Sequence, residues 1–341
     1  MQSLERDRGM TQPDTVLSVR NLNKVYQNAV SWGRPGSKSH VVRDVSFDMR
    51  QGEILGLMGE SGSGKTTLGR LVLQLLPLTS GQVMLEGREL SAMTMQALRP
   101  LRARMQMIFQ DPLFAFNPRH TVHQILSMPL RLHPELVARH GPVNGQISQI
   151  LAQVGLPQDI LHRYPQEFSG GQRQRIGIAR ALILRPSLVV ADEATSALDV
   201  CVQAQILNLL LDLRDQLGLT ILFIAHDLTA MGLVCDRVAV MLRGRIVEIA
   251  PTAELFSRPR HPYTASLLQA IPRIGSRAAT ASSAVVPARI AAGQDMDHGC
   301  PFRMSCRWAV EVCARTDTTL RLFEDGHWSA CHREDLELPG I

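Results

Sequence analysis

A short segment at 59–66 combines glycine, lysine and threonine at a spacing that suits a bound phosphate. It reads GxxxxGKT, and with the residue after it the segment comprises Gly59, Glu60, Ser61, Gly62, Ser63, Gly64, Lys65, Thr66 and Thr67. The glycines let successive backbone N–H groups turn toward an anion, and a helix that begins near Lys65 adds its positive dipole end. Lys65 would contact the β- and γ-phosphates, and the Thr66 hydroxyl would hold Mg²⁺. We therefore predict a nucleoside triphosphate site.

The segments on either side of this loop have the character that such a site needs. The run 53–58 is short and apolar, as expected of a buried strand, and 67–73 has helical periodicity. The alternative is a glycine turn that only joins the strand to the helix. Such a linker would need neither the lysine nor the threonine at these spacings, so we favour the phosphate site.

Two adjacent carboxylates, Asp192 and Glu193, follow the apolar run 188–191. This run predicts a buried parallel strand, and α/β sheets present ligands at the carboxyl ends of such strands. We expect Asp192 to help hold Mg²⁺, directly or through water, and Glu193 to be the general base for a water that attacks the γ-phosphate. The alternative is that both carboxylates only cap the next helix.

A histidine and a tyrosine are further candidates for contacts with the nucleotide. His226 follows the apolar run 220–225, which brings it to the sheet edge that carries Lys65 and Asp192. A contact with the γ-phosphate is therefore favoured over a purely structural histidine. Tyr26 lies just before a loop; by itself it is a structural aromatic, but beside a nucleotide site it would stack on a base.

A second glycine-containing segment precedes the helical pattern at 176–184. It consists of Ser169, Gly170, Gly171 and Gln172. Ser169 suits a helix N-cap, and two glycines at a helix start leave N–H groups free to meet an anion. The alternative is an ordinary capped helix, but the phosphate loop in the same chain favours the anion contact.

The remaining elements must position these residues. The runs 16–20 and 41–48 alternate and predict an antiparallel sheet with an inserted loop at 28–40. The region 121–164 is helix-patterned with interspersed prolines, which indicates a helical subdomain inserted into an α/β core. The length of 341 residues favours one main domain of ordinary size with a smaller appendage.

The composition restricts the class of protein further. Hydrophobic residues make up 45% of the chain, enough for a sizeable core, and the most apolar region is interrupted by charges that a membrane-spanning helix would not carry. Residues 1–14 have no apolar signal-peptide core, so we expect a cytosolic chain. The net charge of +5 is spread out and aromatics are only 4%, which argues against nucleic-acid binding by stacking.

From about 15 to 270 the chain resembles the ATP-binding subunit of an ABC transporter. The motifs that carry the likeness are Tyr26, the phosphate loop, Gln110, Ser169-Gly170-Gly171-Gln172, Asp192-Glu193, Ser196-Ala197-Leu198-Asp199 and His226. The resemblance implies an ABC-type P-loop NTPase core with an antiparallel β subdomain and an inserted helical subdomain. It implies that ATP is bound with Mg²⁺ in a head-to-tail dimer, where Ser169–Gln172 of one subunit closes over the loop of the other. Gln110 would join the ATP and Mg²⁺ site to the loop that touches the membrane partner.

Within this superfamily the chain is similar to the oligopeptide, dipeptide and nickel importer branch. The features that carry this are the long loop before Val41, the segment 109–119 and the segment 261–268, which begins His-Pro-Tyr-Thr. The resemblance implies a peripheral protein on the cytoplasmic face of the membrane, two integral membrane permease subunits and a periplasmic or extracellular substrate-binding protein. It also implies a second, related but different, ATP-binding subunit.

Two alternatives to peptide import stay open at this stage. The same role for nickel or another small solute is one, since cargo selection would lie in the other subunits. A soluble ABC ATPase that remodels nucleic acid or ribosomes is the other. Such proteins resemble paired cassettes or carry long coiled coils, whereas this chain has a single cassette and no sustained heptad repeat.

Four of the six cysteines lie in the last part of the chain. They are Cys300, Cys306, Cys313 and Cys331. We expect an ATP-binding domain at 15–273 with its helical subdomain at about 112–175, a linker at 274–297, and a small Cys-rich C-terminal extension at 298–341. No CxxC pair announces zinc. The resemblance implies a 4Fe-4S cluster held by the four thiolates, and zinc or free thiols are the alternatives.

Overall fold

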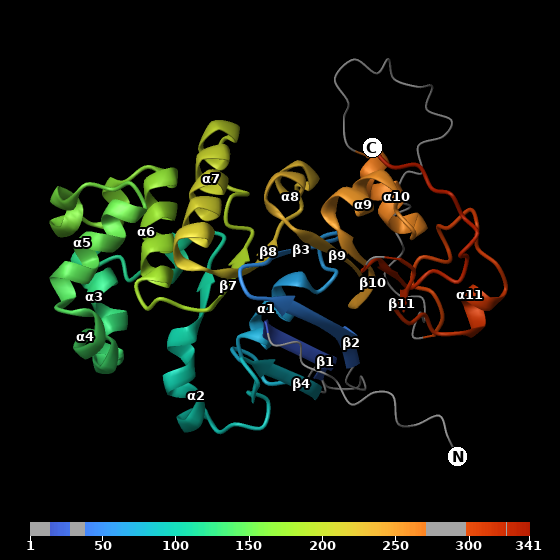
Figure 1. Ribbon diagram of the computed structural model, residues 1–341, viewed down its shortest axis with the longest axis horizontal. Helices are drawn as coiled ribbons and strands as arrows, with labels where there is room; N and C mark the ends of the chain where they lie inside the picture. Colours follow the sequence, from blue (N-terminus) through green and yellow to red (C-terminus); the bar gives the residue numbers. More distant parts are fainter. Residues whose placement is uncertain (1–13, 28–37, 271–297, 325) are drawn as a thin grey trace, which may run out of the picture.

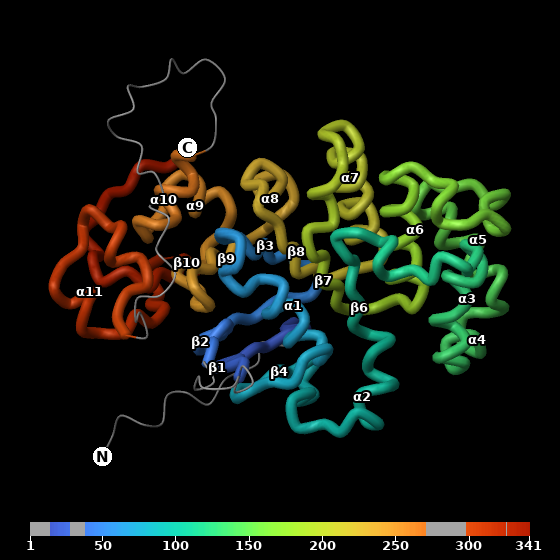
Figure 2. Tube along the Cα trace, turned by 180° about the vertical axis from the view of Figure 1, so that it is seen from behind, coloured from blue at the N-terminus to red at the C-terminus, as the bar shows by residue number. Residues whose placement is uncertain are grey.

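The computed structural model describes residues 14–27, 38–270, 298–324 and 326–341 (Figure 1). Most of the predicted loop at 28–40 and the whole predicted linker at 274–297 lie outside the described residues. Figure 2 shows the same chain from behind.

The main sheet has eight described strands in the order β11-β12-β10-β9-β3-β8-β7-β6. These are β3 (Ile54–Met58), β6 (Met105–Ile108), β7 (Leu188–Asp192), β8 (Thr220–Ile224), β9 (Arg237–Leu242), β10 (Arg245–Pro251), β11 (Arg321–Leu322) and β12 (Trp328–Ser329). The five strands from β9 to β6 are parallel, and the pairs that involve β10, β11 and β12 are antiparallel. Strands β3, β7 and β8 are buried along their whole length, which explains their uninterrupted apolar sequences.

A second sheet of four antiparallel strands confirms the predicted β subdomain. Its order is β2-β1-β4-β5. The strands are β1 (Thr15–Gln27), β2 (Lys38–Arg50), β4 (Ser80–Leu85) and β5 (Arg88–Glu89). Helix α1 (Lys65–Val72) packs its apolar residues against strands of both sheets in one hydrophobic core. The phosphate loop that precedes α1 is therefore held between the two sheets.

The remaining helices surround the main sheet. They are α2 (Met95–Leu101), α3 (Val122–Leu132), α4 (Pro134–His140), α5 (Val143–Gln153), α6 (Gly170–Leu182), α7 (Val200–Leu217), α8 (Leu228–Val234), α9 (Thr252–Ser257), α10 (Pro262–Gln269) and α11 (Val312–Arg315), with 3₁₀ turns at Arg102–Arg104, Pro112–Ala115, Gln158–His162 and Pro165–Glu167. Helices α3, α4 and α5 gather at one end of the long axis, and the C-terminal segment with α11 lies at the other end (Figure 1). Within the described ranges, no helix is long and apolar enough to cross a membrane.

Helix α6 begins earlier than the sequence pattern indicates. The periodicity predicts a helix at 176–184, but the helix runs from Gly170 to Leu182. The Ser169 hydroxyl accepts from the N–H of Gln172, and the Gln172 side chain accepts from the N–H of Ser169. This capping box stabilises a first turn whose two glycines have low helix propensity. The predicted role of Ser169 as the N-cap is confirmed.

Candidate functional site

The phosphate loop has a backbone that only glycine can adopt at two positions. Gly59 has φ of 150°, and a Cβ atom there would lie 2.1 Å from the carbonyl oxygen of Met241. Gly64 has φ of 106°, and its Cβ would lie 2.6 Å from the carbonyl oxygen of Val41. The loop is therefore pressed against the end of β9 and against β2, which leaves no room for a larger residue at these two positions.

Lys65 is buried inside the loop that precedes it. Its Nζ donates to the carbonyl oxygens of Gly59 and Glu60, at 2.7 and 2.9 Å. Burial lowers the pKa of Lys65, while Glu193 and Asp192 act in the opposite direction. An ammonium has three N–H donors, so one donor remains for a phosphate oxygen.

Thr66 and Asp192 are brought together from different elements. The Thr66 hydroxyl, in the first turn of α1, donates to Oδ1 of Asp192, at the end of β7, over 2.9 Å. Burial raises the pKa of Asp192, and the hydrogen bond from Thr66 counteracts the rise. A hydroxyl and a carboxylate are hard oxygen ligands of the kind that Mg²⁺ prefers, so this pair fits the predicted metal.

Glu193 lies next to three polar side chains. Its Oε2 accepts from Nε2 of Gln110 at 3.0 Å, and its Oε1 lies 3.9 Å from Nδ1 of His226. Gln110 also donates to the hydroxyl of Ser196 at 3.2 Å. The His226 side chain is 62% exposed and that of Glu193 is 25% exposed, so a water and a phosphate have access to both.

Two residues that brace the loop are missing from the sequence-based prediction. The N–H of Gly244, in the turn between β9 and β10, donates to the carbonyl oxygen of Ser63 at 2.9 Å. The N–H of Glu60 donates to the hydroxyl of Tyr263 at 3.2 Å. The Arg-Gly pair at 243–244 and the His-Pro-Tyr segment can be recognised in the sequence. Neither pattern, however, indicates a hydrogen bond to the phosphate loop, which lies far away along the chain.

Two predicted site segments do not join this cluster. Among the hydrogen bonds of the described residues, none links Ser169–Gln172 to the phosphate loop. The glycines of that segment pack instead beside Leu198 and Val202, at the start of α7. Tyr26, at the end of β1, is 37% exposed, and the ammonium of Lys24 lies 4.9 Å from its ring centroid. Among the described residues, these two segments therefore do not complete the phosphate site.

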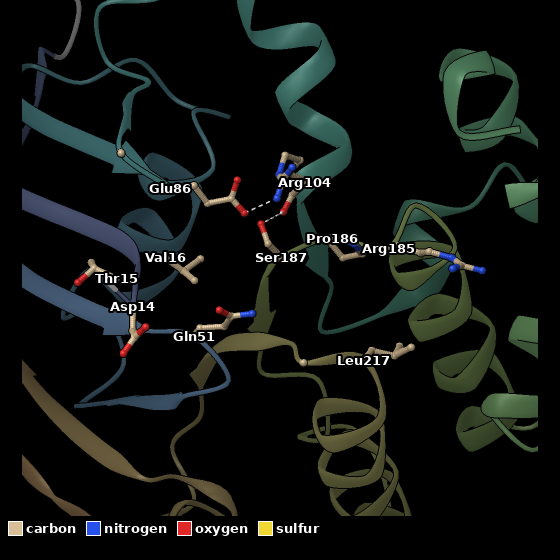
Figure 3. A pocket seen from close by; sticks show the side chains of 12 residues that line it. Asp14, Thr15, Val16, Gln51, Glu86, Arg104, Arg185, Pro186, Ser187 and Leu217 are labelled. Atoms are coloured by element: carbon tan, nitrogen blue, oxygen red, sulfur yellow. Dashed lines mark hydrogen bonds and ion pairs between the residues drawn. The ribbon is translucent and has the colours of Figure 1, made fainter. Parts of the chain in front are cut away.

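A further cavity lies at the opposite edge of the sheet. It has a volume of about 630 Å³ and is lined by residues that include Gln51, Arg104, Ser187 and Gly218, each just before a parallel strand (Figure 3). The Glu86 carboxylate pairs with Arg104 at its rim. Since α/β sheets bind ligands at the carboxyl ends of their strands, we assign the nucleotide to the phosphate loop and not to this cavity.

The four C-terminal cysteines line one small cavity. Cys300, Cys306, Cys313 and Cys331 surround it together with the ring of His261. Burial raises the pKa of Cys300 to about 12 and that of Cys331 to about 11. Among the described side chains, no three His, Cys, Asp or Glu residues are arranged to hold a metal ion. The thiols are gathered around one cavity, but they do not form a ligand group for a single metal ion.

Comparisons with known proteins show the family to which the chain belongs. A family model described as ABC transporter matches residues 42–196, and one described as oligopeptide/dipeptide transporter, C-terminal region, matches residues 247–313. A putative peptide import ATP-binding protein of Brucella ovis is 46% identical over 94% of this chain and 98% of its own length. The oligopeptide transport ATP-binding protein AppF of Bacillus subtilis is 38% identical over 94% of this chain and 97% of its own length.

Solved structures give the same fold. cbiO1 of Clostridium perfringens, described as part of the ABC transporter complex cbiONQ, has a TM-score of 0.60 and 25% identity over 71% of this chain and 91% of its own. The ATP-binding cassette MJ0796, solved as a dimer with ADP and Pi, has a TM-score of 0.60 at 24% identity, covering 69% of this chain and 98% of its own.

The fold and the phosphate site define an ATPase of the ABC type, as predicted. The chain belongs to the ABC transporter family as an ATP-binding subunit. Within this family it belongs to the oligopeptide/dipeptide importer branch.

Proposed function

We propose that this chain binds and hydrolyses ATP at the cytoplasmic face of the cell membrane to power the import of di- or oligopeptides. The observation that carries the proposal is the convergence of Lys65, Thr66, Asp192 and Glu193 at one sheet edge, in a chain whose relatives are named for peptide import. The match to a transporter-specific C-terminal region favours transport over the remodelling of nucleic acid or ribosomes.

In the proposed mechanism, this chain contributes mainly positioning and charge. Lys65 and the loop N–H groups hold the β- and γ-phosphates, and Thr66 with Asp192 would hold Mg²⁺, which supplies positive charge against the phosphate oxygens. Glu193 accepts a proton from a water as that water attacks the γ-phosphorus, and the bond to the ADP oxygen breaks. Gln110 orients the Glu193 carboxylate, and His226 contacts the γ-phosphate.

The proposed site is completed by a second cassette. Ser169–Gln172 start an exposed, capped helix whose N–H groups and dipole suit an anion, yet they have no contact with the phosphate loop of their own chain. In a head-to-tail pair, they would close over the ATP of the other subunit, which we expect to be a related but different chain. Two membrane permease subunits and an external substrate-binding protein complete the proposed importer.

Uptake measurements in cells test which solute the proposed importer carries. A strain that lacks this chain is complemented with the wild-type chain or with the Glu193→Gln variant, and the uptake of a labelled tripeptide and of nickel is measured. Only the wild type should restore peptide uptake, while nickel uptake stays unchanged. If the wild-type chain restores nickel uptake but not peptide uptake, nickel replaces peptides as the proposed cargo.

We also propose a four-thiolate metal site for a 4Fe-4S cluster in the C-terminal segment. The shared cavity and the number and type of donors support it. No group of three such donors among the described residues is arranged to hold a single metal ion, so the proposal rests on the shared cavity and on the four thiols. Purification without oxygen, followed by iron, sulfide and zinc assays, tests this proposal. Iron and sulfide in equal amounts support the cluster, and zinc without iron would replace it.

A further inference from the structure

The segment His261-Pro262-Tyr263 lies far from the phosphate loop in the sequence, yet it reaches that loop. The Tyr263 hydroxyl accepts from the N–H of Glu60 at 3.2 Å, across 203 positions of sequence. The Tyr263 side chain is only 1% exposed, so water cannot readily replace this bond. The Glu60 N–H is directed to Tyr263 and is not among the N–H groups available to a phosphate.

The orientation of Tyr263 is set by its neighbours. Tyr263 lies in the first turn of α10, and its N–H donates to Nδ1 of His261 at 3.1 Å. Burial lowers the pKa of His261 to about 3, so the imidazole is neutral and its nitrogen lone pair can accept. The ring of Phe302, from the C-terminal segment, lies 5.4 Å from the Tyr263 ring in a tilted arrangement.

A buried carboxylate fixes the start of this helix. Glu248, in β10, is fully buried and accepts from the N–H groups of Arg260 and His261 at 2.6 and 3.0 Å. Nε2 of His327, from the C-terminal segment, lies 2.7 Å from the same carboxylate. Strand β10 and the C-terminal segment therefore both hold the element that carries Tyr263, and its hydroxyl is a well-positioned acceptor.

The peptide unit between Gly59 and Glu60 is held on both sides. The Tyr263 hydroxyl accepts from its N–H, and Lys65 donates to its carbonyl oxygen, which is that of Gly59. Lys65 has one further N–H donor for a phosphate oxygen, and a phosphate, which has no donor directed at Tyr263, has no need of its hydroxyl. Both restraints on this peptide can therefore stay in place when nucleotide enters.

We propose that Tyr263 is a positioning residue for ATP binding: its hydroxyl fixes the Glu60 peptide, and thereby keeps the phosphate loop and Lys65 in the arrangement that accepts the β- and γ-phosphates. This inference rests on the proposed ATP site at the loop. It gives the His-Pro-Tyr segment a function in the catalytic domain and links the C-terminal segment to the nucleotide.

The test is the Tyr263→Phe variant of the full-length chain, which removes only the hydroxyl. The unpaired Glu60 N–H lowers the fraction of molecules with a competent loop, and the apparent Kd rises in inverse proportion to that fraction. We expect the Kd of ATP to rise about 5- to 10-fold. The maximal ATPase rate at saturating ATP should stay within about twofold of the wild type, because Glu193 and His226 are unaffected.

Thr264→Val is the matched control. Thr264 is the next residue and is fully buried, and its hydroxyl has no hydrogen-bond partner among the described residues. Its removal should change neither the Kd of ATP nor the rate. Thermal unfolding without nucleotide, measured for both variants, separates a loss of loop positioning from a loss of global stability.

Three possible results bear on the positioning role of Tyr263. A raised Kd in Tyr263→Phe alone, with an unfolding temperature close to that of Thr264→Val, supports the positioning role. An unchanged Kd in Tyr263→Phe overturns it, whatever the unfolding temperature does. If the wild-type chain itself does not bind ATP, the proposed ATP site fails and the inference fails with it.

Discussion

At the scale of single residues, Asp192 and Glu193 are adjacent in sequence but have different surroundings. Asp192 is buried against Thr66, whereas Glu193 turns away with φ of 47° and meets Gln110 and His226. A positive φ in a residue other than glycine is uncommon and often marks a functional site. The two carboxylates thus suit different roles: Asp192 would bind the metal, and Glu193 would accept a proton from water.

The Glu193→Gln variant tests the assigned base. The amide keeps the shape of the side chain but cannot take a proton, so we expect ATP binding within about twofold of the wild type and a rate lower by about 10²–10⁴. ATPase measurements on the assembled transporter check this, with the surface variant Glu254→Gln as the control. A normal rate in Glu193→Gln would remove Glu193 from the role of base.

The Asp192→Asn variant tests the buried carboxylate. The folded-state pKa of Asp192 lies above its ordinary value of 3.8, so the folded protein binds this proton more tightly than the unfolded chain does. Its ionisation therefore lowers stability as pH rises through that window, and the cost persists at neutral pH. Asn still accepts from Thr66. We expect nucleotide-free Asp192→Asn to unfold at a higher temperature than the wild type at pH 7, and the difference to shrink as pH falls toward 3.8.

The same variant should lose the thermal stabilisation that ATP with Mg²⁺ gives the wild type, since one metal ligand is gone. Asp212→Asn, on the exposed face of α7, is the control for removal of a charge and should match the wild type in both assays. A nucleotide-free Asp192→Asn protein that is less stable at neutral pH would contradict the account of this carboxylate.

At the scale of elements, Gly59 in the phosphate loop is in close contact with a neighbouring strand, whereas Gly87, in another turn, is not. Gly59→Ala would bring Cβ against the Met241 carbonyl, so we expect the loop to shift and ATP binding to be lost. Gly87→Ala is the matched control, because Gly87 has φ of 76° but nothing within 4 Å of a Cβ. It should cost about 1 kcal/mol of stability and keep ATP affinity. Nucleotide titration and thermal unfolding of both variants check this; equal affinities would contradict the role of the close contact.

The strands that carry the site could be predicted from sequence because burial on both faces produces continuous apolar runs. The run 188–191 corresponds to β7, which extends one residue further to Asp192. Residues that meet through tertiary contacts could not be predicted in this way. The contact between Glu60 and Tyr263 and the pairing of β12 with β10 depend on packing between distant segments, which no local pattern encodes.

At the scale of the whole molecule, the phosphate site and the segment Ser169–Gln172 lie at two separate places on the chain. Lys65 and Glu193 lie at the carboxyl edge of the main sheet, and Ser169–Gln172 start the helix α6 beside the α3–α5 end of the molecule (Figure 1). The C-terminal strands β11 and β12 extend the main sheet at its other edge, so the Cys-rich segment is part of the same folded unit. One molecule alone therefore holds half of the site that we propose.

The most direct test of this half-site mixes two variants that are each inactive alone, Lys65→Met and Ser169→Phe. In the absence of the related subunit, two copies of this chain can form the head-to-tail pair; Lys65 of the Ser169→Phe chain then faces Ser169 of the Lys65→Met chain, and one intact site forms. We predict that the mixture regains ATPase activity that neither variant has by itself. A wild-type chain that is active alone, together with a mixture that stays as inactive as its components, would contradict the composite site.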